Sequence, residues 1–138
     1  MLKLIVGNKG SGKTKALLEM VDRALAATNG AVVVVEKGSV MTYTLNHKAR
    51  LVDIDEYDIS GFQAFYGFIA GLFAGNYDIT DMFVDASLRI GGRNLEEFAQ
   101  MILKLENVLA KNNACVLFTV SCGPEELPES IQRFTVDF

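Results

Sequence analysis

The chain has little of several residue types that define whole classes of protein. Its 138 residues include two prolines, two cysteines, one histidine and no tryptophan. Cys115 and Cys122 do not have the spacing of a metal site, so we interpret them as buried, reduced thiols. His47 has no metal-spaced neighbours either, and we interpret it as a surface residue. The scarcity of proline and the lack of low-complexity runs argue against a disordered chain.

An excess of basic charge and an apolar run of membrane length are also missing. The formal net charge is −4, so nucleic acid is not expected as a general ligand. The most apolar stretch, residues 62–75, is shorter than the roughly 20 residues that a membrane-spanning helix needs. Met1 leads into a strand pattern without the apolar core of a signal peptide. We therefore expect a cytoplasmic protein with no membrane span.

Residues 62–75 are also unusual in their glycines. Gly67, Gly71 and Gly75 fall on one face of the helix that this stretch predicts. Because glycine destabilises a helix, we expect a close packing partner on that face. Three partners fit the pattern: the protein's own sheet, a subunit interface or a membrane surface.

Strand and helix patterns alternate along the chain. Half of the residues are hydrophobic, which is enough for a core at this length. Apolar, β-branched runs predict strands over residues 2–6, 31–37, 50–55, 81–87 and 114–121. Helical periodicity predicts helices over 12–27, 59–75 and 94–112, whereas 38–49 have no clear pattern and 88–93 indicate a turn. We expect one α/β domain over residues 1–138, with three layers and a mainly parallel sheet of about five strands.

The stretch GNKGSGKT, residues 7–14, fits the pattern G-x-x-x-x-G-K-[ST] at every fixed position. It lies between an expected strand and an expected helix, which makes the match far more specific. Glycines let backbone N–H groups point at phosphate oxygens, and a helix N-terminus favours an anion. Lys13 would reach the β- and γ-phosphates, and the Thr14 hydroxyl would bind Mg²⁺. The expected nucleotide-binding residues are Gly7, Asn8, Lys9, Gly10, Ser11, Gly12, Lys13, Thr14 and Lys15.

On these residues the chain resembles the P-loop NTPase superfamily, and its strand and helix layout is similar as well. The resemblance implies a three-layer αβα P-loop NTPase fold, ATP as ligand and Mg²⁺ as cofactor. A partner acid is expected at the end of a second buried strand, where it holds the Mg²⁺ through water. We choose Asp85 in MFVDA, because Asp81 begins that strand and lies at its other end. Asp55, with Asp53 behind it, is the second candidate, although both equally fit the entry to a helix.

Within that superfamily the chain is similar to RecA-like and KaiC-like ATPases. Their catalytic glutamate follows the strand after the phosphate-loop helix, and Glu36 at the end of AVVVVEK looks like that residue. The resemblance therefore implies Lys13, Glu36 and Asp85 as catalytic residues, with Glu36 positioning the attacking water. The alternative for Glu36 is a solvated charge at a strand end. Thr119 and Ser121 in CVLFTVS are candidates for sensing the γ-phosphate, or ordinary strand residues.

The layout is also similar to nucleoside kinases of the thymidine-kinase type, but their zinc-binding cysteines and substrate lid are missing here. Arg89 and Arg93 lie near the expected active edge and fit a phosphate contact, a subunit interface, a second ligand or a solvated turn. No N-K-x-D motif follows the last strands, which favours ATP over GTP. The shortage of arginines near the phosphates is compatible with a homo-oligomer.

Three functions stay open at this point. The first is a small bacterial or phage Mg²⁺-dependent ATPase of minimal RecA-like type. The second is a nucleotide-dependent switch that hydrolyses slowly and signals to an unidentified protein partner. The third is a phosphotransferase that acts on a nucleoside or another small metabolite.

Overall fold

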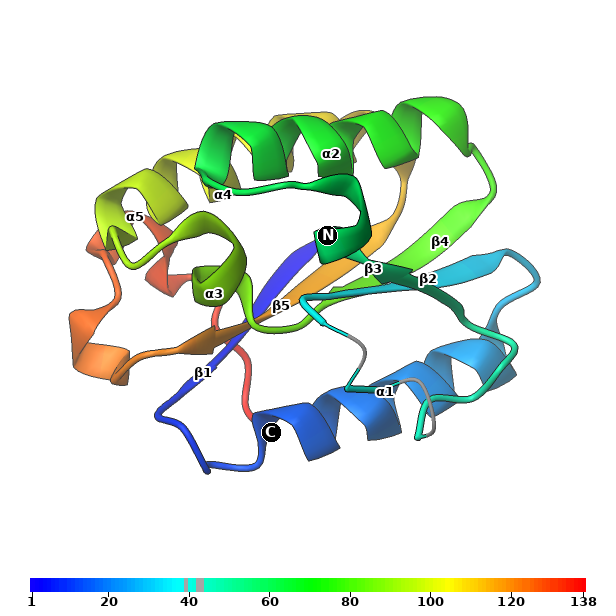
Figure 1. Ribbon diagram of the computed structural model, residues 1–138, viewed down its shortest axis with the longest axis horizontal. Coiled ribbons are helices and arrows are strands. Elements are labelled where there is room, and N and C mark those ends of the chain that lie inside the picture. Colours follow the sequence, from blue (N-terminus) through cyan, green and yellow to red (C-terminus); the bar gives the residue numbers. More distant parts are fainter. Residues whose placement is uncertain (39, 42–43) are drawn as a thin grey trace.

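The computed structural model has three layers, with a five-stranded sheet between helices (Figure 1). It describes residues 1–38, 40–41 and 44–138. The strands are β1 (Leu2–Gly7), β2 (Ala31–Glu36), β3 (Arg50–Asp53), β4 (Ile79–Val84) and β5 (Cys115–Ser121). The helices are α1 (Lys13–Ala27), α2 (Phe62–Gly75), α3 (Ser87–Gly91), α4 (Leu95–Asn112) and α5 (Glu129–Gln132), with 3-10 turns η1 (Ile54–Tyr57) and η2 (Pro124–Glu126). All strand pairs are parallel, in the order β1-β5-β4-β2-β3, which confirms the predicted fold class.

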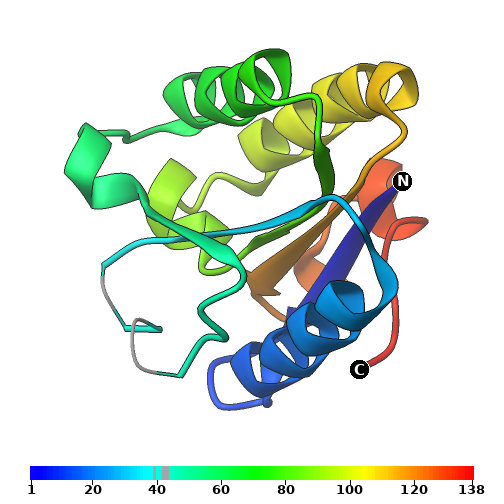
Figure 2. The same ribbon diagram turned by 90° about the vertical axis from the view of Figure 1, so that its right-hand side faces the viewer.

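The helices divide unequally between the two faces of the sheet. Figure 2 shows α1 on one face, with α2 and α4 on the other. On the α1 face, Leu17 and Val21 pack with Ile5, Val34 and Leu117 in a small core. The larger core lies under α2 and α4. Strand β2 is buried along its length, as a continuous run of valines between two helical layers predicts.

Helix α2 turns its glycines away from the sheet. Its buried side chains are Phe62, Phe65, Ile69 and Phe73. A Cβ added to Gly67, Gly71 or Gly75 would meet no described atom within 4 Å. The expectation that these glycines pack on the protein's own sheet is therefore wrong, because the stripe of large apolar side chains occupies that position instead. Among the described helices, none is both long enough and apolar enough to cross a membrane.

Three stretches differ in detail from the predictions. Strand β4 begins two residues earlier than expected and ends at Val84, and the expected turn over 88–93 contains most of the short helix α3. Strand β3 ends at Asp53, whose side chain accepts the Asp55 N–H at 3.0 Å and caps η1. Asp53 and Asp55 therefore form the entry to a helical turn, which is one of the two alternatives that the sequence left open. Within the unassigned stretch 38–49, positions 39, 42 and 43 lie outside the described residues.

The C-terminal segment covers the free edge of β1. The Leu4 N–H donates to the Phe134 carbonyl and the Val136 N–H donates to the Leu4 carbonyl, both at 2.9 Å. Leu4 and Thr135 form a parallel bridge. Pairing of this kind protects a sheet edge that would otherwise present unpaired backbone groups.

Candidate functional site

The carboxyl ends of the five strands form one polar edge of the sheet. In sheet order, the residues at this edge are Gly7, Ser121, Asp85, Glu36 and Asp53. The Asp85 N–H donates to the Val35 carbonyl at 2.9 Å, so Asp85 lies beside the end of β2. Because β5 separates β1 from β4, the loop after β1 must pass over the end of β5 to reach Asp85.

That loop has the curled backbone that its glycine pattern predicts. Gly10 and Gly12 have φ angles of 87° and 90°, which glycine adopts without strain. A Cβ at Gly7 would lie 2.5 Å from the Ser11 hydroxyl oxygen, so the loop closes on itself at this glycine. Helix α1 begins at Lys13, and its free N–H groups are therefore at the end of the loop.

Lys13 is a buried cation held by the oxygens of its own loop. Its side chain is buried, and Nζ donates to the Asn8 carbonyl at 3.1 Å and to Ser11 Oγ at 3.4 Å. Burial lowers the pKa of Lys13, whereas the negative charges of Asp85 and the Cys122 thiolate would raise it. Within the described parts of the chain, no carboxylate forms an ion pair with it. A bound anion would offset the cost of burying this charge.

Asp85 is held by hydroxyl groups on both of its oxygens. Thr14 donates to Oδ2 at 3.3 Å, and Thr119 donates to Oδ1 at 2.5 Å. Thr119 in turn accepts the Ala86 N–H at 2.9 Å. A hydroxyl and a carboxylate side by side are oxygen ligands that suit Mg²⁺, so Thr14 and Asp85 fit the predicted metal site. No three His, Cys, Asp or Glu side chains cluster among the described residues.

These groups line a cleft of about 800 Å³, within the size range of small-molecule and cofactor sites. Seven of the nine expected nucleotide-binding residues line it: Asn8, Lys9, Gly10, Gly12, Lys13, Thr14 and Lys15. Gly7 and Ser11 shape the loop without lining the cleft. The basic lining residues are Lys9, Lys13, Lys15, Arg89 and Arg93, and the acidic one is Asp85. This strongly positive cleft lies on a chain of net charge −4, a combination that favours a polyanionic ligand.

Glu36 lies at the same edge but does not line the cleft. It is 2% exposed, and its carboxylate accepts the Val40 N–H at 2.7 Å and the Met41 N–H at 3.2 Å. Burial raises the pKa of Glu36, and the two N–H groups oppose that shift. Glu36 is thus buried, which excludes the alternative of a solvated strand-end charge. In this conformation it holds the segment after β2.

The four residues whose roles the sequence left open all line the cleft. They are Arg89, Arg93, Thr119 and Ser121. Thr119 is buried with its hydroxyl bonded to Asp85, so it positions the acid. The Ser121 carbonyl accepts a hydrogen bond from Arg93 Nη2 at 3.1 Å. A hydroxyl inside the apolar run of β5 is the signal that marks Thr119, whereas the contact of Arg93 depends on α3, which the sequence did not predict.

The two remaining sequence expectations concern the cysteines and the histidine. Both cysteines are free: Cys122 is buried and Cys115 is half-buried, and burial raises the pKa of each thiol. His47 is exposed, as expected. None of these three side chains lines the cleft.

Comparison with known proteins identifies the class of fold. The five-stranded parallel sheet between helices is a RecA-like three-layer αβα fold. A solved structure similar to this chain is that of the flagellar accessory protein FlaH from Methanocaldococcus jannaschii, with a TM-score of 0.60 and 16% sequence identity. The match covers 96% of this chain and 65% of the FlaH chain. No protein-family model matches the chain, and no curated protein matches it.

Proposed function

We propose that the protein is a Mg²⁺-dependent ATPase that binds ATP in the cleft at the carboxyl edge of the sheet. The observation that carries this proposal is the buried ammonium group of Lys13, which has no described carboxylate partner and lies in a glycine-curled loop beside the Thr14–Asp85 pair. A triphosphate supplies the negative charge that this arrangement lacks. The absence of an N-K-x-D motif after the last strands favours ATP over GTP.

Each residue of the cleft has a distinct part in binding. The loop N–H groups at the start of α1 donate to phosphate oxygens, and Lys13 exchanges its contacts with the Asn8 carbonyl and Ser11 hydroxyl for the outer phosphates. Thr14 and Asp85 hold Mg²⁺, directly or through water. The metal supplies charge neutralisation at the outer phosphates.

Glu36 is the candidate base for the attacking water. Burial raises its pKa, and a general base works best when its pKa lies near the working pH. To act on a water in the cleft, its carboxylate must leave the N–H groups of Val40 and Met41. Turnover therefore requires a rearrangement of the contacts of Glu36 with Val40 and Met41, and we expect it to be slow in the isolated protein.

Steady-state phosphate release from ATP with Mg²⁺ tests the proposal. The assay is run at low and high protein concentration for the unaltered protein and for Glu36→Gln. Turnover that is lost in Glu36→Gln supports an ATPase with Glu36 as base. A specific activity that rises with protein concentration would show that an oligomer is the active form.

A nucleotide-dependent switch is the second candidate, and the contacts of Glu36 favour it. A carboxylate held by two backbone N–H groups in a buried position is engaged in structure rather than in water activation. Tight binding of ATP with no turnover in either protein would support the switch over the ATPase. A partner would then distinguish the nucleotide-bound protein from the free protein.

A further inference from the structure

Two arginines in the cleft differ from the ion-paired arginines elsewhere in the chain. Arg50 pairs with Asp78 at 3.0 Å, and Arg133 pairs with Glu106 at 2.9 Å. Arg89 and Arg93 line the cleft, and neither forms an ion pair with any carboxylate among the described residues. Their charges therefore add to that of Lys13, and the single acid of the cleft, Asp85, is bonded to threonine hydroxyls instead.

A turn that is fixed by hydrogen bonds brings Arg93 to the phosphate loop. Ala86 follows Asp85 with φ 57°, a left-handed conformation that is strained for a non-glycine residue. Its N–H is held by Thr119, and the Ser87 hydroxyl donates to the Thr119 carbonyl at 2.7 Å. These bonds fix the start of α3 against β5. Gly92, with φ 117°, then ends α3 and leads directly to Arg93.

Arg93 and the ammonium group of Lys13 both lie near the start of the loop, because Lys13 Nζ donates to the Asn8 carbonyl at 3.1 Å. Arg93 Nη2 donates to the Ser121 carbonyl at 3.1 Å, and Ser121 is the register partner of Gly7. The contact with Ser121 uses one donor of the guanidinium group, so its other N–H groups stay available to a ligand. A guanidinium group with free N–H donors is suited to bidentate contact with a phosphate.

We infer that Arg93 binds the terminal phosphoryl group of the nucleotide, together with Lys13. One chain then supplies both cations that face this group, and no arginine from a neighbouring subunit is needed. The Ser121 carbonyl sets the direction of the guanidinium group, and Arg89 adds charge from α3. This inference rests on the proposed binding of ATP at the loop.

Isothermal titration with Mg²⁺ and either ATPγS or ADP separates the terminal phosphate from the rest of the nucleotide. We expect Arg93→Gln to weaken ATPγS binding by about tenfold or more, the size of a lost charge-assisted contact, and to change ADP binding by less than about twofold. Arg93→Lys should recover only part of the loss, because an ammonium group cannot bind in the bidentate manner. Arg133→Gln is the control, since it also removes an exposed arginine but one outside the cleft, and both affinities should stay unchanged. Thermal unfolding verifies that each variant is folded.

The outcomes distinguish this inference from the proposed function. If the unaltered protein binds neither nucleotide, the proposed function fails and the inference fails with it. If Arg93→Gln binds both nucleotides as the unaltered protein does, or weakens both equally, the inference alone is overturned. A third titration adds inorganic phosphate to the ADP-bound protein. If Arg93→Gln abolishes that binding while its ATPγS affinity is unchanged, Arg93 serves a second phosphate-bearing ligand, which overturns the inference in favour of a phosphotransferase.

Discussion

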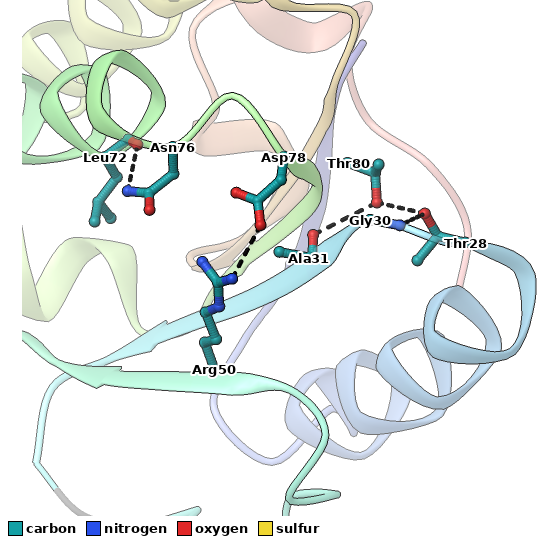
Figure 3. A network of polar contacts seen from close by, with 8 residues as sticks. All are labelled: Thr28, Gly30, Ala31, Arg50, Leu72, Asn76, Asp78 and Thr80. Carbon is teal, nitrogen blue, oxygen red and sulfur yellow. Dashed lines mark hydrogen bonds and ion pairs between the residues drawn. The ribbon is translucent and has the colours of Figure 1, made fainter.

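The two ends of the parallel sheet are both polar, but their polar groups are arranged differently. At the amino ends, the Arg50 guanidinium donates to the Asp78 carboxylate at 3.0 Å (Figure 3). The hydroxyls of Thr28 and Thr80 are 2.8 Å apart, and Thr28 also accepts the Gly30 N–H at 3.0 Å. Each of these donors has an acceptor within the chain. At the carboxyl ends, five basic residues line a cleft with one acid.

A groove near the amino ends of the strands also differs from the carboxyl cleft in its balance of charge. Its volume is about 360 Å³, and Lys3 and Arg23 are matched in it by Asp81 and Asp137. Charges that balance one another near the surface contribute little to stability and need no ligand. The unbalanced charges of the carboxyl cleft repel one another unless an anion is bound. Charge balance, rather than polarity, therefore separates the groove at the amino ends from the cleft at the carboxyl ends.

Glu36→Gln should have the largest effect on the carboxyl end. Loss of a general base lowers turnover by about 10²–10⁴-fold, and ATP affinity should change by less than about twofold because Glu36 does not line the cleft. Phosphate release and nucleotide titration measure the two effects. Turnover equal to that of the unaltered protein would contradict the assignment of Glu36 as base.

The pH dependence offers an independent check on Glu36. Its pKa in the folded protein is raised above the ordinary value of 4.5 because the side chain is buried. Turnover should therefore fall as the pH falls through this raised pKa. The folded state binds the Glu36 proton more tightly than the unfolded chain does, so the free energy of unfolding should fall as pH rises through the same window. Denaturant unfolding at a series of pH values should show this slope, and Glu36→Gln should lack it.

Lys13→Ala should have the next largest effect, on binding. Removing the buried ammonium group should weaken Mg²⁺-ATP binding by about tenfold to one hundredfold, because contacts to the outer phosphates are lost. Lys111→Ala, on the last turn of α4, is the control and should leave the affinity unchanged. Unchanged ATP binding by Lys13→Ala would contradict the assignment of residues 7–14 as a phosphate-binding loop.

Thr119→Val should have a smaller effect, because the buried Thr119 hydroxyl is bonded to Asp85 and positions it. The substitution keeps the shape but removes the bond to Asp85 and leaves the Ala86 N–H without its acceptor, at a cost of about 1–3 kcal/mol in the free energy of unfolding. We expect Mg²⁺ to enhance ATP binding several-fold less than in the unaltered protein. Thr119→Ser keeps the hydroxyl and should restore that enhancement. A Thr119→Val protein with normal Mg²⁺ enhancement would show that Thr119 has only a structural role.

The sequence was sufficient for those parts of the site that depend on strand ends. Parallel strands bring their carboxyl ends to one edge, so the glycine loop and Asp85 could be placed together from their positions after two apolar runs. The same reasoning placed Glu36 at this edge. It could not show which way the carboxylate turns, because that depends on the N–H groups of Val40 and Met41 beyond the strand.

Two features could not be predicted because they depend on competition between local patterns. Helix α3 has five residues, too few for periodicity to reveal, and its start depends on the left-handed Ala86. The position of Arg93 follows from that helix. In α2, the sequence shows that Gly67 and Gly71 share one face of the helix, while large apolar side chains lie on another face. Only one of these two faces can pack against the sheet. Burial of the large side chains removes more apolar area from water, so the glycines face outward.

Arg50→Gln should have the smallest effect, and it tests the amino end of the sheet. The Arg50–Asp78 pair is about half exposed on both sides, so its loss should lower the free energy of unfolding by about 0–1 kcal/mol and leave ATP binding unchanged. A double-mutant cycle with Asp78→Asn, followed by denaturant unfolding, isolates the coupling between the two side chains. If Arg50→Gln weakened ATP binding as strongly as Lys13→Ala, ligand binding would extend to the amino end, and charge balance would no longer distinguish the two ends. A small coupling with unchanged binding would instead show that the matched charges at this end serve the fold. Loss of a cation would then weaken ATP binding only in the cleft, where basic residues outnumber the acid.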